Sequence, residues 1–172
     1  MAGRFDLPEP DAFTRTYWDA AAGGKLLIRR CGACGRAHHY PREFCPHCWS
    51  EDVTWETASG RATLYTWSVV HRNDLPPFPD RVPYVAAVVE LAEGPRMMTE
   101  IVGAGLHRAG EDPELSGGAA LEVVFREGIP VFRPVPRDLN GRGPRGPASR
   151  NPCPQGQPRS SRHGVPDRVP GD

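Results

Sequence analysis

Four cysteines form the pattern in this sequence that points most directly to chemistry. Cys31 and Cys34 make one Cys-x-x-Cys pair, and Cys45 and Cys48 make a second pair after a ten-residue insert. Two residues between thiolates let one tight backbone turn direct both sulfurs at a single ion, and two such turns complete a tetrahedral zinc site. The glycine after the first pair and the proline inside the second are suited to such turns.

A site closed by four thiolates leaves no coordination position for water, so its zinc would stabilise the fold rather than hydrolyse a substrate. A redox dithiol would need one pair at a helix start, and two disulfides would need an oxidising compartment. His38, His39 and His47 could each replace one thiolate. Because four cysteines already complete the set, we expect these histidines to face solvent or to lie just outside the ligands.

Short strands must position the two cysteine turns. Residues 25–30 lead into the first pair, and residues 53–56 follow the second. The order strand, turn, insert, turn, strand is the layout of a zinc ribbon. A segment this short buries too little apolar surface to fold without the metal.

A helix is expected over residues 11–22, before the ribbon. Asp11 is a suitable N-cap, and Gly23-Gly24 ends the helix. Phe13, Tyr17 and Ala21 recur every four residues and form one stripe, with Trp18 beside it. The stripe could pack on this protein's own body or in a groove on a partner chain.

From Gly60 onward the sequence reads as a series of strands joined by turns. On the first strand, Thr63, Tyr65, Trp67 and Val69 share one face, and apolar residues also occur on the other face. Glu127-Gly128 is a two-residue hairpin turn. Five strands predict a small closed barrel of the oligonucleotide/oligosaccharide-binding (OB) type, with a first strand that serves both sides. The expected strands cover residues 61–71, 84–91, 96–102, 121–126 and 129–133.

The loop over residues 72–83 joins the first two strands of this barrel and contains four prolines and Phe78. In OB barrels this loop borders the usual ligand face. A stiff loop with one aromatic residue loses little entropy on docking, so it is a candidate recognition element. The alternative is a connector whose Phe78 covers one end of the barrel.

Composition limits the class of protein. The 172 residues carry 21 Lys and Arg against 21 Asp and Glu, a balance that argues against a dedicated nucleic-acid binder. The longest apolar run, Tyr84–Val89, is far too short to span a membrane, and the first residues do not resemble a secretion signal. We therefore expect a reduced, cytoplasmic protein without membrane contact.

Residues 138–172 differ from the rest in composition. Proline, glycine, arginine and serine dominate this segment, which predicts disorder. Six arginines and three aspartates give it a charge of about +3, so it is either an arm that contacts RNA or anions or a solvated tail. Cys153 lies within it without a partner pair and is interpreted as a free thiol.

The sequence lacks the motifs of a self-contained active site. Gly103-Ala104-Gly105 is followed by Arg108 rather than a third small residue, which argues against a dinucleotide turn. A nucleophile elbow and a phosphate loop are absent from the sequence. His71 and three glutamates on or beside strands are interpreted as surface residues; these are Glu90, Glu93 and Glu100.

Taken together, the ordered motifs resemble a known family. The helix, the two cysteine pairs, Gly60-Arg61-Ala62-Thr63-Leu64-Tyr65, Pro83-Tyr84-Val85, Leu91-x-Glu93-Gly94-Pro95-Arg96 and Pro130-Val131-Phe132-Arg133-Pro134 occur in this order. The chain is similar, over residues 5–136, to zinc-ribbon/OB-fold proteins formerly classed as a domain of unknown function. The resemblance implies an accessory subunit that binds a thiolase-fold enzyme or a steroid side-chain aldolase.

The resemblance also implies a rubredoxin-like ribbon, and we expect four regions: residues 1–24, 25–57, 58–137 and 138–172. Some members of the family hold a coenzyme A (CoA) thioester. From loop position and side-chain chemistry, we expect Phe78 or Tyr84 to stack on the adenine, and Arg72, Arg81 and Arg133 to meet the phosphates.

Three functions follow from these observations. The first is a non-catalytic subunit of a thiolase-like complex that also binds an acyl-CoA, in lipid, steroid side-chain or polyketide-type metabolism. The second is a module for single-stranded nucleic acid, because ribbons and OB barrels often bind DNA or RNA. The third is an acyl-CoA hydrolase or lyase that works alone.

Overall fold

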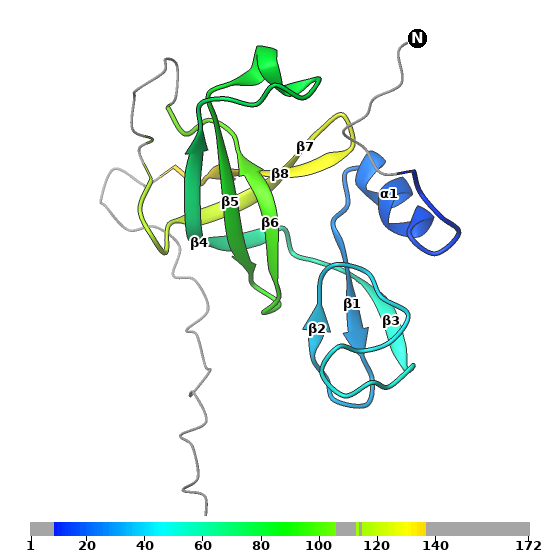
Figure 1. The fold of residues 1–172 in the computed structure, drawn as a ribbon. Coiled ribbons are helices and arrows are strands. Elements are labelled where there is room, and N and C mark those ends of the chain that lie inside the picture. Colours follow the sequence, from blue (N-terminus) through cyan, green and yellow to red (C-terminus); the bar gives the residue numbers. More distant parts are fainter. Residues whose placement is uncertain (1–8, 106–112, 114, 137–172) are drawn as a thin grey trace, which may run out of the picture.

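The structure, a computed structural model, describes residues 9–105, 113 and 115–136 (Figure 1). Within these residues the chain forms one short α-helix, a small three-stranded sheet and a closed five-stranded barrel. This mainly β architecture confirms the predicted fold class. The segment expected to be disordered, with Cys153, lies outside the described residues. The described helices include none that is both long and apolar enough to cross a membrane.

Helix α1 spans Arg15–Ala22 and follows a turn that Asp11 stabilises. The Asp11 carboxylate accepts hydrogen bonds from the backbone N–H of Phe13 at 3.0 Å and of Thr14 at 2.6 Å. These bonds stabilise the turn that precedes the helix. The helix itself begins at Arg15 with Thr14 at the N-cap position, so the expectation of a helix from residue 11 with Asp11 as its N-cap is wrong. Tyr17 is buried, so the aromatic stripe packs on the protein's own body rather than remaining open for a partner.

The ribbon is a three-stranded antiparallel sheet in the order β2-β1-β3. Strand β1, Leu27–Cys31, lies in the centre, between β2, Ala37–His38, and β3, Val53–Thr57. The two strands expected from the sequence, over residues 25–30 and 53–56, are present as β1 and β3. The two-residue strand β2 was missed, because two residues are too few to show the alternation of apolar and polar side chains that indicates a strand.

The barrel closes in the order β4-β5-β6-β8-β7, and β7 pairs back onto β4. All neighbouring pairs are antiparallel except β6 and β8, which run parallel. A hairpin turn with positive φ at Glu127 and Gly128 joins β7 to β8, as the sequence predicts. The strands are β4 Arg61–Val70, β5 Tyr84–Leu91, β6 Arg96–Ile101, β7 Ala120–Arg126 and β8 Ile129–Pro134.

Strand β4 does not alternate as simply as we expected. The register with β5 shifts between Leu64 and Thr66, which leaves Tyr65 as the extra residue of a β-bulge. Leu64 is buried before the bulge and Trp67 packs against the core after it. The prediction that Tyr65 shares a core face with Trp67 is therefore wrong. Tyr65 is 54% exposed, and the Arg96 guanidinium lies 3.6 Å from its ring centroid.

Helix α1 lies beside both the ribbon and the barrel (Figure 1). On the ribbon side, Phe13 lies 5.9 Å from Trp55 between ring centroids, and the Arg29 guanidinium lies over both rings. On the barrel side, the helix contacts β8. The helix therefore bridges the two β units and fixes the space between them.

Candidate metal centre and adjoining cleft

The four cysteines converge on one point. Their sulfur atoms all lie within 4.8 Å of one another, and the Cys31–Cys48 and Cys34–Cys45 sulfur pairs are each 3.6 Å apart. A zinc ion with four sulfur ligands at about 2.3 Å gives sulfur–sulfur distances of about 3.8 Å. The cluster therefore fits one tetrahedral metal ion without rearrangement of the backbone.

The two cysteine turns share one backbone pattern. The N–H of Gly35 donates to the carbonyl of Cys31, and the N–H of Trp49 donates to the carbonyl of Cys45, both at 2.9 Å. Gly35 and Trp49, in equivalent positions, both have positive φ, at 71° and 63°. The first cysteine of each turn is buried and the second is exposed.

Backbone N–H groups also approach the sulfurs. The N–H of Cys34 lies 3.5 Å from the sulfur of Cys31, and the N–H of His47 lies 3.4 Å from the sulfur of Cys45. At Cys45 the backbone N–H of His47 favours the thiolate, which is the form that binds a metal.

The three histidines near the ribbon are not part of this cluster. His47 is exposed, with Nδ1 3.4 Å from an Arg36 nitrogen. His38 is buried in β2, and His39 Nε2 lies 3.2 Å from the Tyr17 hydroxyl. Burial, together with the neighbouring His38, lowers the pKa of His39 to about 4, so its ring is neutral at pH 7. Of the two positions expected for these histidines, facing solvent or lying just outside the ligands, His47 takes the first, whereas His38 does not face solvent.

A cleft of about 280 Å³ lies where helix α1 and the loop after β2 face the barrel. The helix and the loop contribute one wall, formed by Trp18, His39 and Tyr40. Strands β6 and β8 contribute the other wall, which includes Met98 and Ile129. Most of the surface of this cleft is therefore aromatic or aliphatic.

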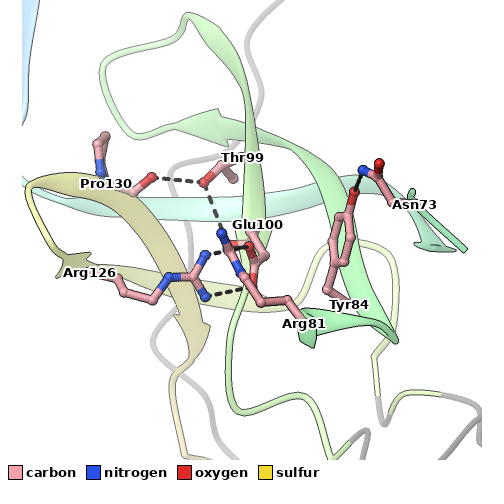
Figure 2. A network of polar contacts seen from close by, with 7 residues as sticks. All are labelled: Asn73, Arg81, Tyr84, Thr99, Glu100, Arg126 and Pro130. Carbon is pink, nitrogen blue, oxygen red and sulfur yellow. Dashed lines mark hydrogen bonds and ion pairs between the residues drawn. The ribbon is translucent and has the colours of Figure 1, made fainter. Parts of the chain in front are cut away.

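Part of the lining of the cleft is a polar network, whose residues are drawn in Figure 2. Arg126 donates to both carboxylate oxygens of Glu100, and Arg81 donates to one of them at 2.8 Å. Glu100 is largely buried, so the expectation that it is a solvated surface residue is wrong. Arg126 was missed, because a single arginine at the end of a strand carries no motif that sequence reasoning could recognise. The same three residues also border a second cleft of about 280 Å³, next to Gly103.

The structure brings together three of the five residues expected to contact CoA. The rings of Phe78 and Tyr84 lie 5.8 Å apart, and the Arg81 guanidinium lies 5.2 Å from the Phe78 centroid. The Tyr84 hydroxyl accepts a hydrogen bond from Asn73 at 3.0 Å (Figure 2). Phe78 belongs to the short 3-10 helix η1, Phe78–Arg81, within the proline-rich loop.

The other two residues lie elsewhere and are engaged differently. Arg72 is paired with Asp74 at 3.0 Å, and its side chain is 85% exposed. Arg133, on β8, is paired with Glu122 on β7 at 2.7 Å. Neither residue lines the two clefts described above.

Comparison with known proteins places the chain in a family. One family model, the rubredoxin-like zinc ribbon domain of ChsH2, matches residues 18–54, and another, the C-terminal OB-fold domain of ChsH2, matches residues 55–126. A DUF35 domain-containing scaffold protein of Methanocaldococcus jannaschii is 36% identical over 102 residues, which cover 59% of this chain and 67% of that protein. The chain belongs to the ChsH2 (DUF35) family. The resemblance inferred from the ordered motifs is thus confirmed.

Two further members of the family share this architecture or sequence. A solved structure described as the Ltp2-ChsH2(DUF35) aldolase aligns with a TM-score of 0.61 and 33% identity, over 74% of this chain and 98% of that one. A "Probable enoyl-CoA hydratase alpha subunit" of Thermomonospora curvata is 38% identical over 128 residues. That match covers 71% of this chain but 38% of the hydratase subunit, so this chain spans little more than a third of that relative.

Proposed function

We propose that this chain is a non-catalytic accessory subunit that binds a thiolase-fold enzyme and an acyl-CoA. The observation that carries the proposal is the match to the Ltp2-ChsH2(DUF35) aldolase over 98% of that chain, because it covers the ribbon and the barrel together. Relatives named as a scaffold and as a hydratase subunit support a role within acyl-CoA enzyme complexes.

The surface of the described residues is compatible with a partner. Trp49 and Met98 are 73% and 79% exposed, and Tyr40 and Leu75 are also exposed large apolar residues. Aromatic residues and methionine are enriched in protein interfaces relative to the rest of a protein surface. In this proposal the four cysteines would hold zinc, which supplies stability to the ribbon and takes no part in the partner's reaction.

The test is affinity purification of the tagged chain from its native cells, followed by mass spectrometry of the proteins retained. We expect a thiolase-fold enzyme in a fixed ratio to the chain. A chain that elutes alone and monomeric would contradict the proposal. The purified single chain is also incubated with acyl-CoA, and turnover without a partner would favour the hydrolase or lyase alternative.

One observation favours the nucleic-acid alternative. Tyr65 is exposed on the barrel rather than buried in its core, and an exposed aromatic ring can stack on a base. The Arg96 guanidinium already covers that ring, however. Salt-dependent retention of the chain on single-stranded oligonucleotide resin would support this alternative, and we expect no retention at about 0.15 M salt.

A further inference from the structure

Arg29, on the central ribbon strand β1, is a buried charged residue without an acidic partner. It is 8% exposed, and the residues opposite it are His38 on β2 and Trp55 on β3. Within the part of the chain that the structure describes, Arg29 forms no ion pair and its Nε–H has no hydrogen-bond acceptor. A buried charge is costly unless nearby groups compensate it. The contacts that Arg29 does make must therefore supply that compensation.

Two aromatic rings and one carbonyl contact the Arg29 guanidinium. The guanidinium lies 4.7 Å from the ring centroid of Trp55 and 5.4 Å from that of Phe13, in the turn before helix α1. It also donates a hydrogen bond to the carbonyl of Val53 at 2.8 Å. A cation is attracted to the face of an aromatic ring, and more strongly when it is removed from water. Because Phe13 belongs to the helical segment and the other two groups to the ribbon, Arg29 joins these two parts of the molecule.

The position of Arg29 depends on the strand pairing at the cysteines. Arg29 lies two residues before Cys31, and Val53, which accepts its hydrogen bond, pairs with Cys31 across β1 and β3. Small metal-binding domains commonly fold only when the metal is bound. Loss of the metal would therefore separate β1 from β3, and Arg29 and Trp55 would no longer lie side by side on one face of the sheet.

Helix α1 depends on contacts of this kind, because it has only eight residues. Isolated helices shorter than about 12 residues are marginal in water. Tyr17 also ties the helix to the loop after β2, through its hydroxyl contact with His39 and a ring contact with Tyr40 at 5.7 Å. Trp18, which lines the cleft, lies edge-on to Tyr17 at 5.0 Å between ring centroids. The ribbon thus supports both the helix and the side chain that the helix contributes to the cleft.

We propose that Arg29 is a positioning residue that couples the metal centre to helix α1, so that the Trp18 wall of the cleft is ordered only while the ribbon holds its metal. This coupling goes beyond the proposed function, because it is a property of the single chain and needs neither a partner nor an acyl-CoA. The metal centre then controls the conformation of the cleft in addition to stabilising the ribbon.

The experiment compares backbone hydrogen exchange in the full-length, zinc-loaded wild type and in Arg29→Met, with zinc content measured on the same samples. Arg29→Met keeps a long unbranched side chain and removes the guanidinium. We expect exchange in Arg15–Ala22 to be faster by about tenfold or more, and exchange in Tyr84–Leu91 to be unchanged. Chelation of the metal from the wild type, under reducing conditions, should accelerate exchange in Arg15–Ala22 at least as much.

Arg30→Met is the matched control. Arg30 is the next residue of β1, but its guanidinium is paired with Glu56 at 2.7 Å and donates to the carbonyl of Gly35 rather than contacting the helical segment. This variant should leave exchange in Arg15–Ala22 within about twofold of wild type.

Two further variants separate the charge from packing and from metal binding. Arg29→Lys keeps a cation beside the two rings and should restore much of the protection of the helix, which a loss of packing alone would not predict. Phe13→Leu removes the ring that comes from outside the ribbon. It should accelerate exchange in the helix without changing the zinc content, and so it tests the coupling even if Arg29→Met binds zinc poorly.

A second measurement uses the wild type alone. Hydroxyl-radical footprinting reports the solvent exposure of individual tryptophan side chains with and without the metal. We expect oxidation of Trp18 to rise several-fold when the metal is removed, because the helix that carries it is released. Trp67, which packs against the core from the barrel, is the internal control and should not change.

Unchanged exchange in Arg15–Ala22 and unchanged oxidation of Trp18 after complete removal of the metal would show that the barrel alone holds the helix, and would overturn the proposal. Wild-type exchange of the helix in zinc-loaded Arg29→Met and Phe13→Leu would do the same, as would equal acceleration in Arg30→Met or equal exchange in Arg29→Lys and Arg29→Met. Faster helix exchange in the metal-free chain and in zinc-loaded Phe13→Leu, with Arg30→Met unchanged, would support it.

Discussion

The ribbon and the barrel occur in one chain but are stabilised in different ways. The ribbon has three short strands and four cysteines that meet at one point. The barrel closes on itself around a core of buried apolar side chains, among them Leu64, Val89 and Phe132. The cysteines, whose chemistry is the clearest in the sequence, therefore serve stability, whereas the cleft lies where helix α1 and the loop after β2 face the barrel.

The largest expected effect is that of metal removal. Zinc in a closed four-thiolate site contributes on the order of 10 kcal/mol to folding. The buried apolar core extends to Leu27 and Ile28 of β1, but most of its residues belong to the barrel. Chelation, or the variant Cys48→Ser, should therefore unfold the ribbon and leave the barrel folded. Hydrogen exchange should show lost protection in Leu27–Cys31 and Val53–Thr57 and retained protection in Tyr84–Leu91.

A uniform loss of protection across both units would mean that they form one cooperative body, and the comparison would fail. Unchanged protection of the ribbon after complete removal of metal would show that its side chains alone hold it together. Metal content is measured on the same samples by mass spectrometry.

A core substitution in the barrel should have the converse effect. Phe132 is fully buried on β8, and its carbonyl accepts a hydrogen bond from Val102. Phe132→Ala removes a ring and leaves a cavity, which should lower the free energy of unfolding of the barrel by about 3–5 kcal/mol. The zinc content should not change.

Chemical denaturation followed by Trp67 fluorescence in single-tryptophan variants measures this effect. Tyr65→Ala is the matched control, because it removes an exposed aromatic ring from the same barrel. We expect it to cost less than about 1 kcal/mol. Loss of zinc from Phe132→Ala would show that the ribbon depends on the barrel.

The sequence predicted the parts of the molecule that depend on local spacing. The cysteine pairs and the turn at Glu127-Gly128 each involve residues within a few positions of one another, so their geometry follows from the backbone alone. The five barrel strands were also recognisable, because their apolar runs are bounded by turn residues.

The sequence did not predict contacts that depend on how the barrel closes. Arg81, Glu100 and Arg126 come from three separate segments, and nothing in their spacing indicates that they meet. The bulge at Tyr65 was missed because one extra residue reverses the face of the sheet on which each later residue of the strand lies, and this leaves the composition of the strand unchanged. The placement of Arg72 and Arg133 away from the clefts follows from their own acidic neighbours.

A moderate effect should come from His39, at the junction of ribbon and helix. Its pKa of about 4 in the folded chain lies below the ordinary value of about 6.5. The unfolded chain therefore binds a proton between these values that the folded chain does not. Stability is full above about pH 6.5 and falls, by up to about 3 kcal/mol, as the pH decreases toward 4.

His39→Gln keeps a hydrogen-bonding side chain near the Tyr17 hydroxyl and should reduce the loss of stability between pH 7 and pH 5.5. The free energy of unfolding is measured by denaturation of zinc-saturated protein, with metal content checked at each pH. His71→Gln, at an exposed histidine, is the control. An equal pH dependence in His39→Gln and wild type would show that other groups, such as His38, account for it.

The smallest expected effect concerns the two cysteine turns of the ribbon. Gly35 and Trp49 hold the same positive-φ position in the two cysteine turns. A side chain at Gly35 would have open space around it, so Gly35→Ala measures the cost of the conformation alone, about 1 kcal/mol. Trp49→Gly removes that cost but also removes the stacking of Trp49 on Phe44, whose ring centroid is 5.2 Å away. Such stacking contributes about 1 kcal/mol to stability, so the two effects nearly cancel.

We therefore expect Trp49→Gly to be nearly neutral in denaturation experiments on the isolated chain, and Gly35→Ala to be destabilising. Trp49 is 73% exposed and adopts a backbone conformation that glycine adopts more easily. If Trp49→Gly is neutral, stability does not explain why a tryptophan occupies this position. Backbone strain of this kind concentrates at functional positions, and exposed tryptophans often anchor interfaces. Trp49→Gly should accordingly weaken capture of the thiolase-fold partner by about tenfold, whereas Gly35→Ala should not; equal capture by both variants would leave Trp49 without a role in the interface.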